Sequence, residues 1–132
     1  MGIFGLGRIG GALASRAKAL GLNVIATESM PDPEGVRELQ IDIVDFDTLL
    51  AQSDIISLHC PLNDDTQGLF NASVFAKMKP NSILINTARG KVVNEADLIS
   101  ALQENQLGGA GLDVFSTASY VNPTEPLRAD ST

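Results

Sequence analysis

Three glycines near the start of the chain have a spacing that suits a phosphate-binding turn. Gly5, Gly7 and Gly10 form the pattern Gly-x-Gly-x-x-Gly. Where a strand turns into a helix, the first glycine permits the tight turn and the second lets a diphosphate approach the backbone. The third lets the helix pack closely on the sheet. Unpaired N–H groups at the helix start would then face the anion.

An acidic residue at the matching distance extends this pattern. Glu28 follows Gly10 by eighteen positions. A carboxylate at the end of the second strand can accept hydrogen bonds from the ribose hydroxyls of an adenosine and would repel a 2′-phosphate. Nearby Met30 and Pro31 offer no cation for such a phosphate, which leaves a folded-back Arg37 as the alternative. Glycine-rich turns also occur where helix and sheet merely pack closely. Together, the turn and the acid predict a dinucleotide site that favours NAD over NADP.

The flanking residues supply the strands and the helix that such a turn needs. Residues 1–4 are an apolar run typical of a buried strand, and apolar residues recur at helical spacing over 9–20, up to Gly21. Residues 23–27 predict the second strand. The polar, proline-bearing residues 31–40 indicate a loop with a fragment of strand at its end.

The rest of the chain alternates helix and strand patterns. Helices are predicted over 45–52, from an N-cap at Asn71 through Lys77, and from an Asn94–Asp97 capping box to about Glu104; strands are predicted over 54–58, 82–86 and 108–115. This alternation predicts an α/β fold: a Rossmann-type doubly wound parallel sheet in a single three-layer domain over residues 1–132. Ligands would bind beyond the carboxyl ends of the strands.

The amino-acid composition limits the kinds of partner that the protein can bind. The 132 residues carry a net charge of −7 and no Lys/Arg cluster, which argues against nucleic-acid or anionic-membrane binding. Cys60 is the only cysteine, so an intrachain disulfide and a cysteine-based zinc site are excluded, and no metal site is expected. No apolar stretch reaches membrane-spanning length and no signal-peptide pattern is present, so a cytoplasmic protein that binds a small molecule is expected.

Four ordered motifs narrow the family. They are GLGRIG at 5–10, SLHCPL at 57–62 with Thr66, INTARG at 85–90, and GLDVF at 111–115 followed later by EPL at 125–127. The chain resembles the D-isomer-specific 2-hydroxyacid dehydrogenases from Gly2 to Asp130. The resemblance implies an NAD-dependent oxidoreductase that transfers a hydride between NAD(H) and a small 2-hydroxy or 2-keto acid. It also suggests a homodimer.

The resemblance assigns roles to individual residues. Arg8 and Ile9 would lie at the pyrophosphate, Thr87 to Arg89 would reach toward the nicotinamide, and Asp113 would hold its carboxamide end. His59 is interpreted as a hydrogen-bonded histidine at the cofactor rim. The predicted cofactor-binding residues are Gly5, Gly7, Arg8, Ile9, Gly10, Glu28, His59, Cys60, Pro61, Thr66, Thr87, Ala88, Arg89 and Asp113.

Arg89 is the first catalytic candidate. A guanidinium at a strand end can hold a substrate carboxylate and polarise the neighbouring carbonyl as hydride arrives. Residue type alone favours a solvated loop arginine or a salt bridge to Asp113. The surrounding NTARG motif favours the catalytic role instead.

The acid partner departs from the family pattern. The family places a glutamate a few residues after the strand-end aspartate, where this chain has Ala118. Residues 116–124 therefore look like an insertion, after which Glu125 resumes the pattern. Glu125 could return to the site, because an extra loop costs little entropy, or it could be an exposed carboxylate.

The other catalytic parts of the family are missing from the sequence. The family's catalytic histidine would come beyond Thr132, and His59 does not correspond to it. The family's substrate domain is absent too, so the isolated chain is expected to bind cofactor with little or no turnover. Two alternatives remain: an NAD-dependent regulatory protein similar to the C-terminal binding protein corepressors, with 116–124 as an interaction surface, or a truncated or engineered Rossmann scaffold.

Overall fold

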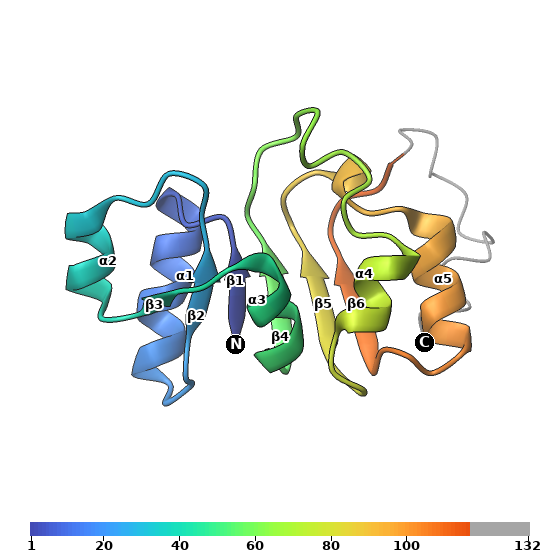
Figure 1. Cartoon of the computed structure of the whole chain (residues 1–132), viewed down its shortest axis with the longest axis horizontal. Coiled ribbons are helices and arrows are strands. Elements are labelled where there is room, and N and C mark those ends of the chain that lie inside the picture. Colours follow the sequence, from blue (N-terminus) through green and yellow to red (C-terminus); the bar gives the residue numbers. More distant parts are fainter. Residues whose placement is uncertain (117–132) are drawn as a thin grey trace.

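A single parallel sheet organises the molecule. The computed structural model describes residues 1–116 of the chain. Its strands are β1 (Gly2–Phe4), β2 (Ile25–Thr27), β3 (Asp42–Ile43), β4 (Ile55–Leu58), β5 (Ile83–Asn86) and β6 (Gly109–Leu112). They pair in parallel in the order β3-β2-β1-β4-β5-β6. This order, which reverses direction beside β1, confirms the predicted doubly wound Rossmann-type sheet (Figure 1).

Helices cover the sheet on both faces. They are α1 (Arg8–Ala19), α2 (Pro33–Leu39), α3 (Phe46–Gln52), α4 (Ala72–Lys77), α5 (Glu95–Gln103) and the 3-10 helix η1 (Gly90–Val92). Adjacent strand residues face opposite ways. Ile3 accordingly packs in a small core with Ala14 and Ala17 of α1, whereas Phe4 packs against the larger core on the other face. The three-layer architecture predicted from the sequence is therefore confirmed.

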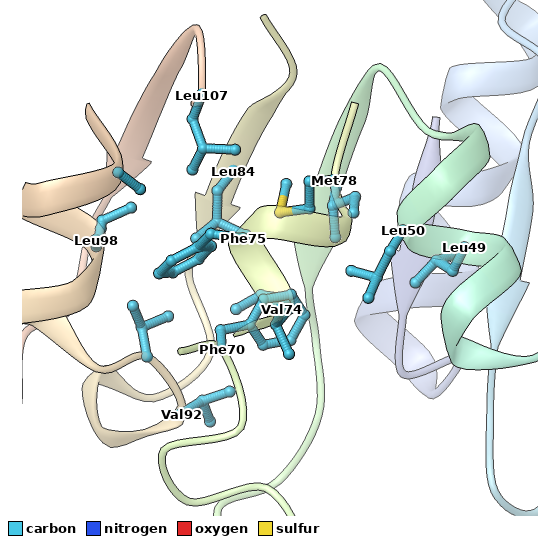
Figure 2. Close-up of a cluster of buried hydrophobic side chains, with 14 of the residues drawn as sticks. Leu49, Leu50, Phe70, Val74, Phe75, Met78, Leu84, Val92, Leu98 and Leu107 are labelled. Atoms are coloured by element: carbon cyan, nitrogen blue, oxygen red, sulfur yellow. The ribbon is translucent and has the colours of Figure 1, made fainter. Parts of the chain in front are cut away.

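The larger core lies between the sheet and α3, α4 and α5. Phe75 of α4 is packed among Leu84 of β5, Leu98 of α5 and Leu107, as Figure 2 shows. All four side chains are buried. Since apolar surface on three helices and the central strands is removed from water here, this core fixes the carboxyl edges of β4, β5 and β6 relative to one another.

The predicted loop over 31–40 is wrong, because this segment contains α2. The Asp32 side chain accepts hydrogen bonds from the backbone N–H groups of Glu34 (3.3 Å) and Gly35 (3.2 Å), and Pro33 occupies the first helical position, where its missing N–H costs nothing. No residue of α2 is fully buried, and its apolar residues are only Val36 and Leu39, so the apolar periodicity that reveals a helix is short. The strand fragment predicted at the end of residues 31–40 lies just after them, as β3.

The predicted capping box of α5 forms only in part. The Asn94 side chain accepts a hydrogen bond from the N–H of Asp97 (3.1 Å), as predicted. The Asp97 carboxylate instead accepts from the N–H of Ala72 (2.9 Å) and so caps α4, while the Asn94 N–H donates to the Phe70 carbonyl (2.9 Å). The two helix starts are thus tied together. The last strand is also shorter than the predicted 108–115.

Candidate cofactor site

The glycine turn joins β1 to α1, and its glycines serve different needs. Gly5 has a φ of +96°, and a Cβ there would lie 2.7 Å from the backbone carbonyl carbon of His59. A Cβ on Gly10 would lie 2.1 Å from the Gly5 oxygen. A Cβ on Gly7 would meet no atom within 4 Å. The fold itself therefore requires Gly5 and Gly10, whereas Gly7 leaves open space at the start of α1.

Glu28 is tied to this turn. Its carboxylate accepts a hydrogen bond from the backbone N–H of Leu6, between the first two glycines, at 2.6 Å. Its other oxygen accepts from the N–H of Met30 at 3.3 Å. Glu28 is half-buried. An ionised carboxylate accepts several hydrogen bonds at once, so the held group can still accept from ligand hydroxyls.

A cavity of about 450 Å³ opens beside the turn and Glu28. Phe4 of β1, Phe46 at the start of α3, and Leu69 form an apolar part of its wall. The Phe4 and Phe46 ring centroids are 5.2 Å apart. The cavity is lined by Phe4, Gly5, Gly7, Thr27, Glu28, Ser29, Phe46, His59, Cys60, Pro61, Asn63, Asp65, Thr66 and Leu69. It combines an apolar wall with a carboxylate and a glycine turn.

The loop after β4 is shaped by Thr66. The buried Thr66 hydroxyl donates to the Pro61 carbonyl oxygen at 2.6 Å and accepts from the Asn63 N–H at 2.9 Å. The Asn63 side chain accepts in turn from the N–H groups of Asp65 (2.9 Å) and Thr66 (3.0 Å). This network folds residues 61–66 into a fixed side of the cavity.

His59 and Cys60 line the cavity as uncharged groups. The His59 Nε2 lies 2.7 Å from the Ser57 hydroxyl, and His59 lines the cavity. Its place at the rim of a bound cofactor stays a prediction. Burial lowers the pKa of His59. Burial raises the pKa of the Cys60 thiol, and the negative charge of Glu28 raises it further. Both shifts favour the neutral forms of His59 and Cys60.

The ends of β5 and β6 form a second part of the edge, outside the cavity wall. The buried Asn86 side chain accepts from the Ala88 N–H and donates to the Arg89 carbonyl, each at 3.0 Å. Arg89 is exposed, and its guanidinium donates to the Ala88 carbonyl at 2.8 Å. In the part of the chain that the structure describes, no ion pair joins Arg89 to Asp113, which removes the salt-bridge alternative.

The structure does not gather every predicted residue in one place. The cavity brings together Gly5, Gly7, Glu28, His59, Cys60, Pro61 and Thr66. Arg8 lines a neighbouring cavity of about 550 Å³ between α1 and α2, and the Ile9 side chain is 70% exposed. Thr87, Ala88, Arg89 and Asp113 follow β5 and β6. Glu125 and all but Ser116 of the insertion 116–124 lie outside the described residues.

The sequence prediction missed the apolar wall of the cavity. The sequence places Phe4 only in a buried strand, and no pattern marks Phe46 or Leu69 as a site residue. The available signal was that Phe4 ends β1 at its carboxyl edge. Within residues 1–116, no cluster of His, Cys, Asp or Glu could hold a metal ion, and no helix is long and apolar enough to cross a membrane.

A parallel sheet with this strand order, a glycine turn after its first strand and an acid after its second defines the class of dinucleotide-binding Rossmann domains. Residues 1–131 match the family model described as D-isomer specific 2-hydroxyacid dehydrogenase, NAD binding domain. The chain belongs to this family, as an NAD-binding domain.

Relatives and solved structures agree with the family. A glyoxylate reductase of Thermococcus litoralis is 49% identical over 92% of this chain and 37% of its own length. A D-isomer specific 2-hydroxyacid dehydrogenase from Lactobacillus delbrueckii ssp. bulgaricus, solved with NAD, has a TM-score of 0.86 and 40% identity over 94% of this chain and 38% of that chain. A D-lactate dehydrogenase from Lactobacillus jensenii with NAD+ has a TM-score of 0.86 at 38% identity and is covered over 40% of its length. The chain thus spans well under half of these proteins.

Proposed function

We propose that this domain supplies the cofactor half of an oxidoreductase that transfers a hydride between NAD(H) and a small 2-hydroxy or 2-keto acid. Residues 1–132 form one cofactor-binding domain in this proposal, and the substrate domain and the catalytic histidine belong to other parts of a longer parent protein. Relatives named for glyoxylate, glycerate and hydroxypyruvate support this substrate class. A homodimer of this longer protein also remains a prediction.

The open space above Gly7 is the observation that carries the proposal. Its neighbours Gly5 and Gly10 are explained by backbone contacts inside the protein, but nothing in the described residues crowds Gly7. No side chain caps α1, so the N–H groups of its first turn can face an anion. A pyrophosphate lying on Gly7 would use both features.

The remaining groups suit the other parts of NAD. The Glu28 carboxylate can accept from the ribose hydroxyls of the adenosine half, and the apolar wall with Phe4 and Phe46 suits a flat ring. Arg89 and Asp113 stand at the carboxyl ends of β5 and β6, where the nicotinamide and the reacting acid would meet. In that position the exposed Arg89 guanidinium would bind the substrate carboxylate and polarise the carbonyl.

The charge of Glu28 provides the test of the cavity as the adenosine site. In the Glu28→Gln variant the amide oxygen can still accept from the Leu6 N–H, but the negative charge is gone. The ratio of NADPH to NADH dissociation constants, measured by calorimetric titration, is expected to fall toward one. Glu34→Gln, which removes an exposed carboxylate from α2, is the matched control and should leave the ratio unchanged. An equal fall in both variants, or in neither, would remove Glu28 from the proposed site.

A further inference from the structure

Asn86 has an unusual environment for an amide. It ends β5 between Leu58 of β4 and Leu112 of β6, and only 1% of its surface is exposed. Among the described residues it is the one buried carboxamide. A buried amide without partners costs free energy, so an apolar side chain would be the simpler choice at this position.

Both ends of the Asn86 side chain are used on the loop that follows. Its oxygen accepts from the Ala88 N–H and its nitrogen donates to the Arg89 carbonyl, which closes the chain around a buried anchor. The Asn86 backbone carbonyl accepts from the Asp113 N–H at 3.0 Å. One residue therefore fixes the loop after β5 and the end of β6 relative to each other.

The far end of the same loop is held by close packing. A Cβ on Gly90 would lie within 2.0 Å of the Phe115 backbone, so the two backbones touch there. Between these anchors, Thr87 and Arg89 are exposed and Ala88 is half-buried. Ala88 packs against the larger core, and the Arg89 carbonyl also accepts from the Val92 N–H at 3.2 Å. The Asn86 amide adds a side-chain hydrogen bond to each of these two residues.

We infer that Asn86 is a positioning residue for the nicotinamide half of the cofactor site, acting through the backbone of Thr87–Arg89. This inference rests on the proposed function, because it takes the loop to be the part that meets the nicotinamide. Asn86 itself is too buried to contact a ligand. Its effect must pass through the Ala88 N–H and the Arg89 carbonyl, the two groups to which its side chain is hydrogen-bonded.

The test compares NADH with ADP-ribose, which lacks the nicotinamide. Calorimetric titrations of the whole chain are expected to show that Asn86→Ala weakens NADH binding by about tenfold, because two buried hydrogen bonds are lost, and leaves ADP-ribose affinity close to wild type. Asn94→Ala, which removes the cap of α5 and neither hydrogen bond of the Asn86 side chain, is the control for a general loss of stability and should not change the ratio of the two affinities.

A second variant and a measurement on the unmodified chain guard against misfolding. Asn86→Asp keeps an acceptor for the Ala88 N–H but cannot donate to the Arg89 carbonyl, and it should also weaken NADH selectively. In the wild-type chain, amide hydrogen exchange should show the Ala88 N–H protected although it lies in an exposed loop. An Ala88 N–H that exchanges as fast as an unstructured peptide would overturn the inference.

The outcomes separate this inference from the function on which it rests. If wild type binds neither NADH nor ADP-ribose, the proposed function fails and the positioning role fails with it. If wild type binds both, and Asn86→Ala and Asn86→Asp retain the wild-type ratio of NADH to ADP-ribose affinity, only the role of Asn86 is overturned. Equal weakening of both ligands would show a structural role alone and would also overturn it.

Discussion

Glu28 and His59 lie on the same cavity and respond differently to their surroundings. The Glu28 carboxylate accepts from the Leu6 and Met30 N–H groups, which supply donors that water would otherwise provide. His59 has the Ser57 hydroxyl as its partner and is partly buried. At the scale of residues, the site therefore places a hydrogen-bonded carboxylate on the same cavity as a histidine whose pKa is lowered by burial.

His59 predicts a pH dependence of stability. Its pKa in the folded protein lies below the 6.5 of the unfolded chain, so the unfolded state binds more protons between these two values. The contribution of His59 to the free energy of unfolding should be fully present above about pH 6.5. It should be lost as the pH falls toward the pKa of His59 in the folded protein. Urea denaturation at several pH values between 5 and 8 measures this.

His59→Gln is the matched variant, since its amide can also bond to Ser57. It should flatten the slope between pH 5 and 7, because His59 is the only histidine of the chain. The lowered pKa values of Asp45 and Asp54 change stability only at pH values around and below their ordinary pKa of 3.8. The raised pKa of Cys60 changes stability only around and above its ordinary pKa of 9.0. An unchanged slope in the variant would assign the pH dependence to other groups.

Sequence reasoning found the residues whose chemistry is tied to a local pattern. The glycines and Glu28 have a fixed spacing around one strand-helix-strand unit, and His59 with Cys60 marks the end of a strand. The cavity wall could not be found this way, because Phe46 and Leu69 reach it from segments that follow other strands. Their contact depends on the packing of α3 and of the loop before α4, which no local spacing encodes.

At the scale of elements, the start of α1 serves both the fold and the proposed ligand site. The helix has no side-chain cap and no acidic residue in its first turn, whereas α2, α3, α4 and α5 are all capped by an Asp or Asn side chain. Those caps bind the N–H groups of their own helices. The first turn of α1 is thus the one among these helices available to an anion.

Two glycine substitutions in this turn should separate stability from binding. Gly7→Ala places a Cβ in open space and should cost only about 0.5–1 kcal/mol of stability, since alanine is a poorer N-cap than glycine. It should nevertheless weaken NADH by about tenfold or more, because the pyrophosphate can no longer approach the backbone. Thermal or urea unfolding together with NADH titration measures both effects.

Gly10→Ala is the counterpart. Its Cβ would strike the Gly5 oxygen, which cannot rotate away, so stability should fall by about 2–3 kcal/mol before any ligand is added. If Gly7→Ala lowers the free energies of NADH binding and of unfolding by the same amount, that result would contradict the view that Gly7 serves a ligand and not the fold.

The elements themselves were largely predictable, with one instructive exception. Strands β1, β2, β4 and β5 are apolar runs that the larger and smaller cores bury, and α1 has an apolar face. The helix α2 buries no residue fully and has only Val36 and Leu39 as an apolar pair, so its main signals were the Asp32 cap and Pro33. Capping chemistry outweighed periodicity there, and a prediction based mainly on periodicity assigned a loop.

At the scale of the whole molecule, the domain is expected to bind cofactor and to lack turnover. The parts that hold and protonate a 2-keto acid belong, in this proposal, to the rest of a longer protein. A missing general acid costs about 10²–10⁴-fold in rate, and lost positioning costs more. When the chain is mixed with NADH and glyoxylate or hydroxypyruvate, the rate of NADH oxidation followed by absorbance should therefore equal the rate without the protein. Appreciable reduction would show that residues 1–132 contain a complete active site.

The most direct test of the central claim is a calorimetric titration of the chain with NADH and, separately, with NADPH. The claim is that the cavity beside Gly7 and Glu28 is an NAD site. One molecule of NADH should bind per chain, and NADPH should bind more weakly because its 2′-phosphate would meet the Glu28 carboxylate. Failure to bind either cofactor, or tighter binding of NADPH, would contradict the account.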